Sequence, residues 1–247
     1  MTRLIEDKEN AECDILDNNI SAVIVVEDEP IFYSRFLPLL YSEILGLSAD
    51  LKNVNSRPNV LLCENYEDAE QYLQKYGQNI IGVISDIQFP KDKTMCESAG
   101  LQFCRQVKAY RENIPVLLQS KNQDQRDVAH ASGAYFIWKD SDMFLRNLRT
   151  FMLNYFGFGN FIFRLPGGSE IASAATLEEL LEQVKTISAK SITYHADRQH
   201  FSSWLNIHGH HELSYKLYRV SSEQPGEDIR KELIDYLTEY VKKQKAE

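Results

Sequence analysis

The segment "SAVIVVEDEP", residues 21–30, joins a short apolar run to three consecutive carboxylates. The run from Ala22 to Val26 has the length and the β-branched residues of a strand, and it is apolar on both faces. A strand of this kind is typical of a parallel sheet that helices cover on both sides. Three acidic residues, Glu27, Asp28 and Glu29, follow at its carboxyl end, and their charge needs a partner.

The same alternation of apolar runs and amphipathic stretches continues for more than a hundred residues. It predicts five βα repeats, and therefore an α/β domain with a five-stranded parallel sheet. The predicted strands cover residues 22–26, 60–63, 80–85, 115–119 and 135–138, and the predicted helices cover residues 31–45, 66–76, 99–110, 123–132 and 141–154.

Polar side chains follow four of the predicted strands, at the edge where such sheets bind ligands. They are Glu27 and Asp28, then Asp86, Ser120 and Lys139. Carboxylates about 4 Å apart repel one another by several kcal/mol even at an effective dielectric constant of roughly 20. Mg²⁺ suits such a cluster because it prefers oxygen ligands, and a carboxylate beside it can accept a phosphoryl group.

Each motif alone also fits an ordinary structural role. Acidic residues after a strand often form a solvated loop or cap a helix, as Asp28 would before Pro30. Asp86 is different, because an apolar strand gives no structural reason for a carboxylate, and a buried carboxylate is costly unless it is paired. The combination of these side chains at four strand ends therefore favours a phosphoryl-accepting site.

Four segments, "VIVVEDEP", "VISDIQFP", "VLLQS" and "YFIWK", resemble the conserved motifs of response regulator receiver domains from two-component systems. They occur in the expected order, and the resemblance spans residues 21–155. It implies a flavodoxin-like (βα)5 fold and Mg²⁺-dependent phosphorylation by a sensor histidine kinase or a phosphotransfer protein. It implies no enzymatic activity beyond the domain's own phosphorylation and dephosphorylation.

The resemblance also implies a role for single residues. Asp86 is the expected phosphoacceptor, and Ser120 and Lys139 are expected to contact the phosphoryl group. Phe136 stands where the family has its rotating aromatic side chain. The expected ligands of Mg²⁺ are Glu27, Asp28, Asp86 and the backbone carbonyl of Gln88.

Three features depart from the family pattern. Asp140 replaces the usual proline after Lys139, so a trans peptide is expected there. Lys121 follows Ser120 where a small residue is usual, and the long segment Lys91–Ala99 could form a lid. These departures keep open an alternative, in which the domain is a pseudo-receiver that binds partner proteins without being phosphorylated.

The regions on either side of the receiver-like domain have different compositions. Residues 1–20 carry six acidic side chains against Arg3 and Lys8, and we expect a flexible acidic leader. Residues 156–247 are expected to form a smaller α+β domain with an output or interaction role. They hold 11 basic and 13 acidic residues, which argues against DNA binding.

Turn and capping signals outline this second domain. A hairpin is expected around residues 166–168, and Thr176 with Glu179 forms a capping box before a helix. We expect a strand over residues 191–196 and two helices separated by Gly209. An amphipathic helix over residues 227–243 would pack on its own domain or form a homodimer.

Five of the six histidines lie in this second domain. His195, Arg198, His200 and Trp204 form a candidate site for an anion or a protein, and a metal-dependent or catalytic function is a further alternative. Their spacing matches no standard metal-ligand pattern. The segments "FGFGNFIFRLPGG" and "YHADRQHFSSWL" show a weaker similarity to parts of phosphoenolpyruvate synthase-like multidomain proteins.

Composition argues against several classes of partner and location. The net charge of −9 argues against nucleic acid as a partner, and no apolar run is long enough to span a membrane. The four cysteines have no disulfide or zinc spacing. Together with the lack of a signal-peptide pattern, these features predict a cytoplasmic protein.

Overall fold

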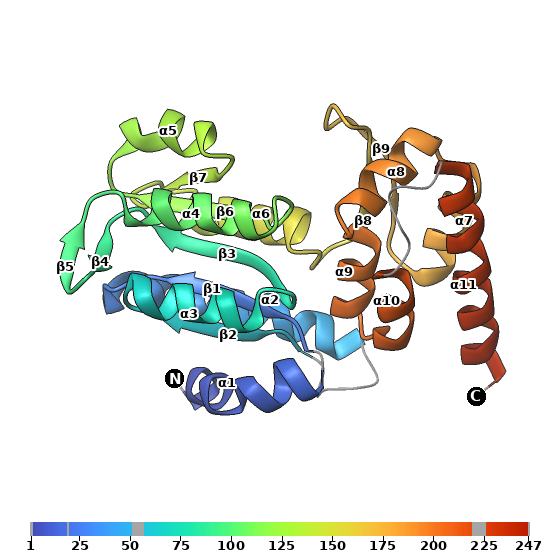
Figure 1. The fold of residues 1–247 in the computed structure, drawn as a ribbon, viewed down its shortest axis with the longest axis horizontal. Coiled ribbons are helices and arrows are strands. Elements are labelled where there is room, and N and C mark those ends of the chain that lie inside the picture. The colour runs from blue at the N-terminus through green and yellow to red at the C-terminus, as the bar shows by residue number, and fades with distance from the viewer. Residues whose placement is uncertain (1, 19, 51–56, 219–225, 247) are drawn as a thin grey trace. The chain divides into compact units, whose positions relative to one another are not determined.

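The computed structural model describes residues 2–18, 20–50, 57–218 and 226–246. The chain divides into two compact units, Met1–Phe156 and Gly157–Glu247. Figure 1 shows the helices and strands of both. Across the described residues, no helix combines the length and the apolar character needed to cross a bilayer.

The first unit is built on the five-stranded parallel sheet that the sequence predicted, in the order β2-β1-β3-β6-β7. This is the strand order of flavodoxin-like folds, in which the direction of strand addition reverses between β1 and β3. The strands are β1 (Ala22–Val26), β2 (Asn59–Cys63), β3 (Ile80–Asp86), β6 (Val116–Ser120) and β7 (Tyr135–Trp138).

Helices cover both faces of this sheet, and so every residue of β1 and β3 is buried (Figure 1). α3 packs against α4, and α2 packs against α6. The predicted helix over 123–132 is a 3-10 turn followed by a short α-helix. The bounds are α2 (Pro30–Asp50), α3 (Tyr66–Tyr76), α4 (Ala99–Tyr110), the 3-10 turn Gln123–Gln125, α5 (Arg126–Ala131) and α6 (Phe144–Tyr155).

The segment after β3 forms a small antiparallel hairpin of β4 (Phe89–Lys91) and β5 (Thr94–Cys96). Its turn residues Asp92 and Lys93 both have positive φ, at 50° and 63°, as a tight two-residue hairpin requires. Phe89 is buried, and the Asp92 backbone N–H donates to Glu67. The long insertion is therefore a folded element anchored on the domain.

The expectation of a flexible leader is wrong for most of residues 1–20. Residues Thr2–Glu12 form α1, and Cys13–Asp17 continue it as a π-helical turn. Asp7 is fully buried because its carboxylate accepts hydrogen bonds from Tyr41, Arg57 and the backbone N–H of Val60. These partners lie far away in the sequence, so local composition could not reveal them.

The second unit begins with the predicted hairpin, formed by β8 (Phe161–Arg164) and β9 (Glu170–Ala174). α7 (Leu177–Thr186) follows, and the Thr176 hydroxyl accepts a hydrogen bond from the Glu179 N–H, as predicted. The Glu179 carboxylate reaches back to the N–H of Ala175, one residue before the cap. The capping box is thus present in a slightly shifted form.

The strand expected over 191–196 is instead part of a helix, α8 (Ala189–Asp197). Its buried residues are Ser191, Ile192, His195 and Ala196, which recur at helical and not at alternating spacing. The two helices expected around Gly209 are present as α9 (His200–Ile207) and α10 (His211–Tyr218), and Gly209 has a φ of 79°.

The last helix, α11 (Gly226–Ala246), packs on α7, α8 and α10 of its own unit. Its apolar stripe is buried in the core of that unit, through Ile229, Leu233, Leu237 and Val241. This contact accounts for the amphipathic pattern without a second copy of the chain, so the homodimer stays a prediction with no separate support.

Candidate functional site

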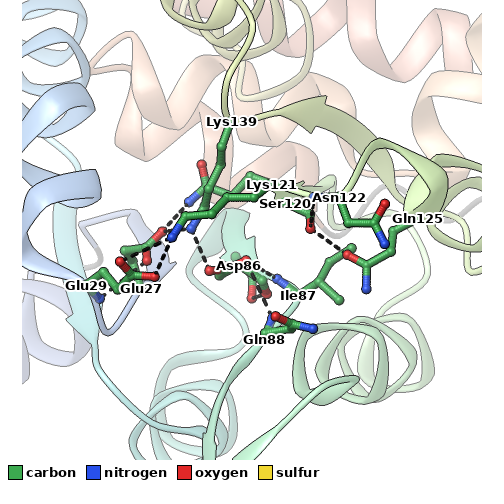
Figure 2. A network of polar contacts seen from close by, with 12 residues as sticks. Glu27, Glu29, Asp86, Ile87, Gln88, Ser120, Lys121, Asn122, Gln125 and Lys139 are labelled. Atoms are coloured by element: carbon green, nitrogen blue, oxygen red, sulfur yellow. Dashed lines mark hydrogen bonds and ion pairs between the residues drawn. The ribbon is translucent and has the colours of Figure 1, made fainter.

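The site lies beyond the carboxyl ends of β1, β3, β6 and β7, beside the reversal of strand order between β1 and β3. Figure 2 shows that the predicted residues Glu27, Asp86, Ser120 and Lys139 converge there. The parallel register places Val26 of β1 beside Ser85 of β3, so the residues that follow each strand are brought to the same edge.

Three carboxylates form the acidic part of the site. Glu27, Asp28 and Asp86 each offer an oxygen, and these oxygens all lie within 4.8 Å of one another. Glu27 is fully buried, Asp28 is half-buried and Asp86 is 7% exposed. Such proximity and burial create a strong demand for positive charge.

Lys139 supplies part of that charge. Its Nζ atom lies 2.7 Å from Oε2 of Glu27 and 2.5 Å from Oδ2 of Asp86. The side chain is only 1% exposed, and a lysine is buried to this degree only when it is paired. The pairing explains why a buried lysine can directly follow the short strand β7.

One ammonium does not balance three carboxylates, and burial makes the ionised forms of Glu27 and Asp28 costly. Burial raises the pKa of Glu27 to about 7; Lys139 opposes this shift and the Asp86 charge adds to it. Burial also raises the pKa of Asp28, with a further contribution from Asp86. An all-oxygen donor set with excess negative charge fits Mg²⁺.

The backbone around Asp86 is shaped for close approach. Oδ1 of Asp86 accepts hydrogen bonds from the N–H groups of Ile87, at 2.6 Å, and Gln88, at 3.5 Å. The Gln88 side chain is exposed, which leaves its backbone as the part that faces Asp86. A Cβ atom at Gly100 would lie 2.1 Å from the Asp86 carbonyl oxygen, so only glycine fits at this start of α4.

Ser120 is close to Asp86 in the sheet but its hydroxyl is engaged elsewhere. It donates to Oε1 of Gln125 at 2.5 Å and accepts from the Asn122 N–H at 3.0 Å. Figure 2 shows these partners on the side of Ser120 that leads to α5. The hydroxyl would have to leave Gln125 to contact a group on Asp86.

Phe136 is half-buried on β7 and packs against the core of the first unit. The guanidinium of Arg126, at the start of α5, lies 5.8 Å from the centroid of its ring. Both Phe136 and Gln125 thus connect the site with the same short helix. The peptide that follows Lys139 is trans, which agrees with Asp140 in place of proline.

Three residues contribute to the site although sequence reasoning gave them no role there. Gln119 donates through Nε2 to Oε2 of Glu27 at 3.0 Å, and it is a buried amide in an apolar strand, which was the available signal. Phe32 on α2 lies beneath the ammonium of Lys139, at 4.3 Å from Nζ to the ring centroid. Glu29 accepts from Lys121 at 3.1 and 3.4 Å.

The candidate residues of the second unit come together only in part. His195 and His200 are in contact, with 2.9 Å between their Nδ1 atoms. Arg198 instead stacks on Tyr194, with 4.3 Å from its guanidinium carbon to the ring centroid. Trp204 is buried in the core, and its indole N–H donates to the Gly159 carbonyl.

The backbone fixes the protons of the histidine pair. Nε2 of His195 accepts a hydrogen bond from the Arg164 N–H at 2.8 Å, so a neutral His195 carries its proton on Nδ1. That proton is donated to Nδ1 of His200, which therefore carries its own proton on Nε2. Burial lowers the pKa of His195 to about 2 and that of His200 to about 4, with smaller contributions from nearby Arg198 and Arg164.

This arrangement argues against the metal-dependent alternative. Both ring nitrogens of His195 are used internally, and His200 offers a donor N–H where a metal needs a lone pair. Within the described parts of the second unit, no three His, Cys, Asp or Glu residues gather as metal ligands. The pair holds the hairpin β8–β9 against α8 and α9.

No protein-family model matches the sequence, and no curated protein matches it. Among solved structures, the chain is similar to a response regulator receiver domain protein from Clostridium thermocellum, with 20% identity, a TM-score of 0.36, and coverage of 52% of this chain and 90% of that one.

Two further structures are similar. For NtrX from Brucella abortus the identity is 17%, the TM-score 0.37, and the coverage 56% of this chain and 27% of that one. For the phosphorylated cyanobacterial phytochrome response regulator RcpA the identity is 14%, the TM-score 0.37, and the coverage 62% of this chain and 99% of that one. The similarity of the second unit to phosphoenolpyruvate synthase-like proteins stays a prediction.

Proposed function

We propose that the first unit is a receiver domain that accepts a phosphoryl group on Asp86 and thereby acts as the switch of a two-component response regulator. One observation carries this proposal. A single buried ammonium, that of Lys139, is paired with both Glu27 and Asp86 at the strand ends, and the half-buried Asp28 completes the acidic cluster.

The chemistry is a transfer between two nucleophiles. A carboxylate oxygen of Asp86 forms a bond to the phosphorus of a phosphohistidine, while the bond from phosphorus to the donor's imidazole nitrogen breaks and its electron pair stays on that nitrogen. Lys139 is placed to neutralise charge on the transferred oxygens. The donor is a sensor histidine kinase or a phosphotransfer protein.

Mg²⁺ would be held by the carboxylates of Glu27, Asp28 and Asp86 and by the backbone carbonyl of Gln88. When bound, the ion would supply positive charge that offsets repulsion between the carboxylates and the incoming phosphoryl oxygens. Gln119 and Lys139 orient Glu27 in the structure, and the N–H of Ile87 orients Asp86.

The hydroxyl of Ser120 connects this chemistry with α5. A phosphoryl group brings about −1.5 to −2 charge and three acceptor oxygens, which compete with Gln125 for the Ser120 proton. Loss of the bond from Ser120 to Gln125 would free the 3-10 turn before α5. The second unit is then the output module, with a role in protein interaction and without DNA binding or separate catalysis.

The decisive test is phosphorylation with acetyl phosphate and Mg²⁺, followed by mass spectrometry of the intact protein. We expect one added phosphoryl group on the wild type and none on Asp86→Asn. Asp92→Asn is the matched control, because Asp92 is exposed at the hairpin tip and has a positive φ that asparagine tolerates. An unmodified wild type would favour the pseudo-receiver alternative.

A further inference from the structure

Lys121 is a second cation at the mouth of the site, and it has no counterpart in the roles assigned above. Its Nζ atom lies 3.1 and 3.4 Å from the two carboxylate oxygens of Glu29. Figure 2 shows the side chain extending from the end of β6 toward Glu29. The residue directly follows Ser120, so its backbone belongs to the site.

Two further contacts hold Lys121 in this position. Its backbone carbonyl accepts a hydrogen bond from the Trp138 indole at 2.9 Å. Its Nζ lies 4.5 Å from the centroid of the Phe32 ring, and Nζ of Lys139 lies 4.3 Å from the same centroid. One aromatic ring therefore contacts both ammonium groups, and this keeps Lys121 close to the buried pair of Lys139 with Asp86.

The two lysines differ in burial and in the strength of their ion pairs. Lys139 is almost fully buried and already shared by two carboxylates, so it can offset only part of the charge that a phosphoryl group adds. Lys121 and Glu29 are exposed, with side chains 53% and 47% accessible. Exposed ion pairs of this kind contribute little to stability, so Lys121 can leave Glu29 at low cost.

We propose that Lys121 is a second phosphoryl-binding residue. It pairs with Glu29 until Asp86 carries a phosphoryl group, and then binds that group instead. The inference rests on the proposed function, because it needs phosphorylation of Asp86. Phosphorylation adds negative charge where Lys139 is already shared. Lys121 is the nearby cation that can exchange a weak partner for a stronger one.

Beryllofluoride, which mimics an aspartyl phosphate, is the probe. We would titrate it into the full chain carrying Trp204→Phe, so that Trp138 is the one tryptophan left, at saturating Mg²⁺ and follow the fluorescence. Lys121→Met should bind beryllofluoride about threefold to tenfold more weakly than the wild type, and Lys121→Arg should retain most of the affinity. Glu29→Gln should bind it more tightly, because it releases Lys121.

A double variant gives the sharper result. The gain from Glu29→Gln should disappear in the Lys121→Met background, since Glu29 acts through Lys121. Lys75→Met is the matched control, because Lys75, in the last turn of α3, forms a similarly exposed pair with Glu12, with side chains 39% and 71% accessible. It should bind beryllofluoride like the wild type.

The possible failures are distinguishable. If the wild type and Lys75→Met do not bind beryllofluoride, the proposed function itself is wrong. If both bind it and Lys121→Met binds it equally well, the receiver function stands and the role of Lys121 is overturned. An equal gain from Glu29→Gln with and without Lys121 would also overturn that role.

Discussion

Glu27 keeps its proton to a higher pH than an ordinary glutamate does. It is fully buried, receives hydrogen bonds from Gln119 and Lys139, and still has a pKa raised to about 7 because burial outweighs the lysine's charge. In the unfolded chain the same carboxyl titrates near 4.5. Between these two values the folded protein binds the proton and the unfolded chain does not.

This difference sets the sign of a pH effect. Without Mg²⁺, the free energy of unfolding should fall as the pH rises from about 4.5 to about 7, by up to roughly 3 kcal/mol from Glu27 alone. Saturating Mg²⁺ should remove most of this slope, because it stabilises the ionised carboxylate. Urea unfolding at pH 5, 6, 7 and 8, with EDTA or with Mg²⁺, measures both effects.

Glu27→Gln is the control for that experiment. It keeps the shape and the hydrogen-bonding capacity of the side chain but cannot titrate, so its metal-free unfolding free energy should lack the Glu27 slope. Wild type and variant with the same pH dependence would contradict the buried, proton-binding state of Glu27.

At the residue scale, sequence patterns located the site better than they located its partners. Asp86 could be found because an apolar strand gives no structural reason for a carboxylate, and Lys139 could be found because it follows the fifth strand where the receiver pattern has a lysine. Gln125 and Phe32 could not, because a polar residue in a turn and an aromatic residue in a helix are unremarkable. Their roles depend on side-chain directions that only the folded chain fixes.

At the scale of elements, α1 is the part of the first unit that differs most from the sequence-based expectation. Asp7 accepts a hydrogen bond from the N–H of Val60 on the outermost strand, β2, and the Asn59 amide donates to the backbone of α1. The Asp7 carboxylate also pairs with Arg57 at 2.5 Å. The helix is therefore tied to the sheet by buried polar contacts.

Asp7→Ala should lower the free energy of unfolding by about 3 to 5 kcal/mol, because it leaves Arg57 and two buried donors without their acceptor. Chemical denaturation of residues 1–156 or of the full chain measures the change. Glu9→Ala, an exposed position on the same helix, should change stability by less than about 0.5 kcal/mol. Equal effects at both positions would show that the Asp7 contacts do not stabilise the fold.

Element prediction succeeded where the pattern was long and failed where it was short. The five strands and their helices were predictable because an apolar run of strand length is followed each time by an amphipathic stretch of helix length. The six residues of "SITYHA" favoured a strand through Ile192 and Thr193, but packing of Ile192 and His195 on one side selects a helix. α1 was missed because its apolar face is small and its main contact is a carboxylate.

At the scale of the whole molecule, each of the two units has its own set of buried apolar residues. Those of the first unit extend as far as Phe156, and the apolar cluster of the second unit begins at Phe161. Phe156 belongs to the first unit, because its ring packs against Gly82 of β3, where a Cβ atom would lie 1.9 Å from it. The boundary after Phe156 therefore separates two sets of contacts.

We expect residues 1–156 and residues 157–247 to fold as separate fragments. The first fragment should bind Mg²⁺ with the affinity of the full chain to within about twofold, as measured by isothermal titration calorimetry, because all the acidic ligands lie within it. The second should show cooperative thermal unfolding by circular dichroism. A first fragment that binds Mg²⁺ much more weakly would mean that the second unit supports the site.

The attachment of α1 also has a practical consequence for handling the first unit. A fragment that starts at residue 20 would lose the Asp7 carboxylate that accepts from the Val60 N–H and would uncover the outer side of β2, and bare edge strands associate with one another. Such a fragment should precipitate or form oligomers at concentrations where residues 1–156 stay monodisperse. We therefore expect the acidic segment at the start of the chain to protect the sheet from aggregation.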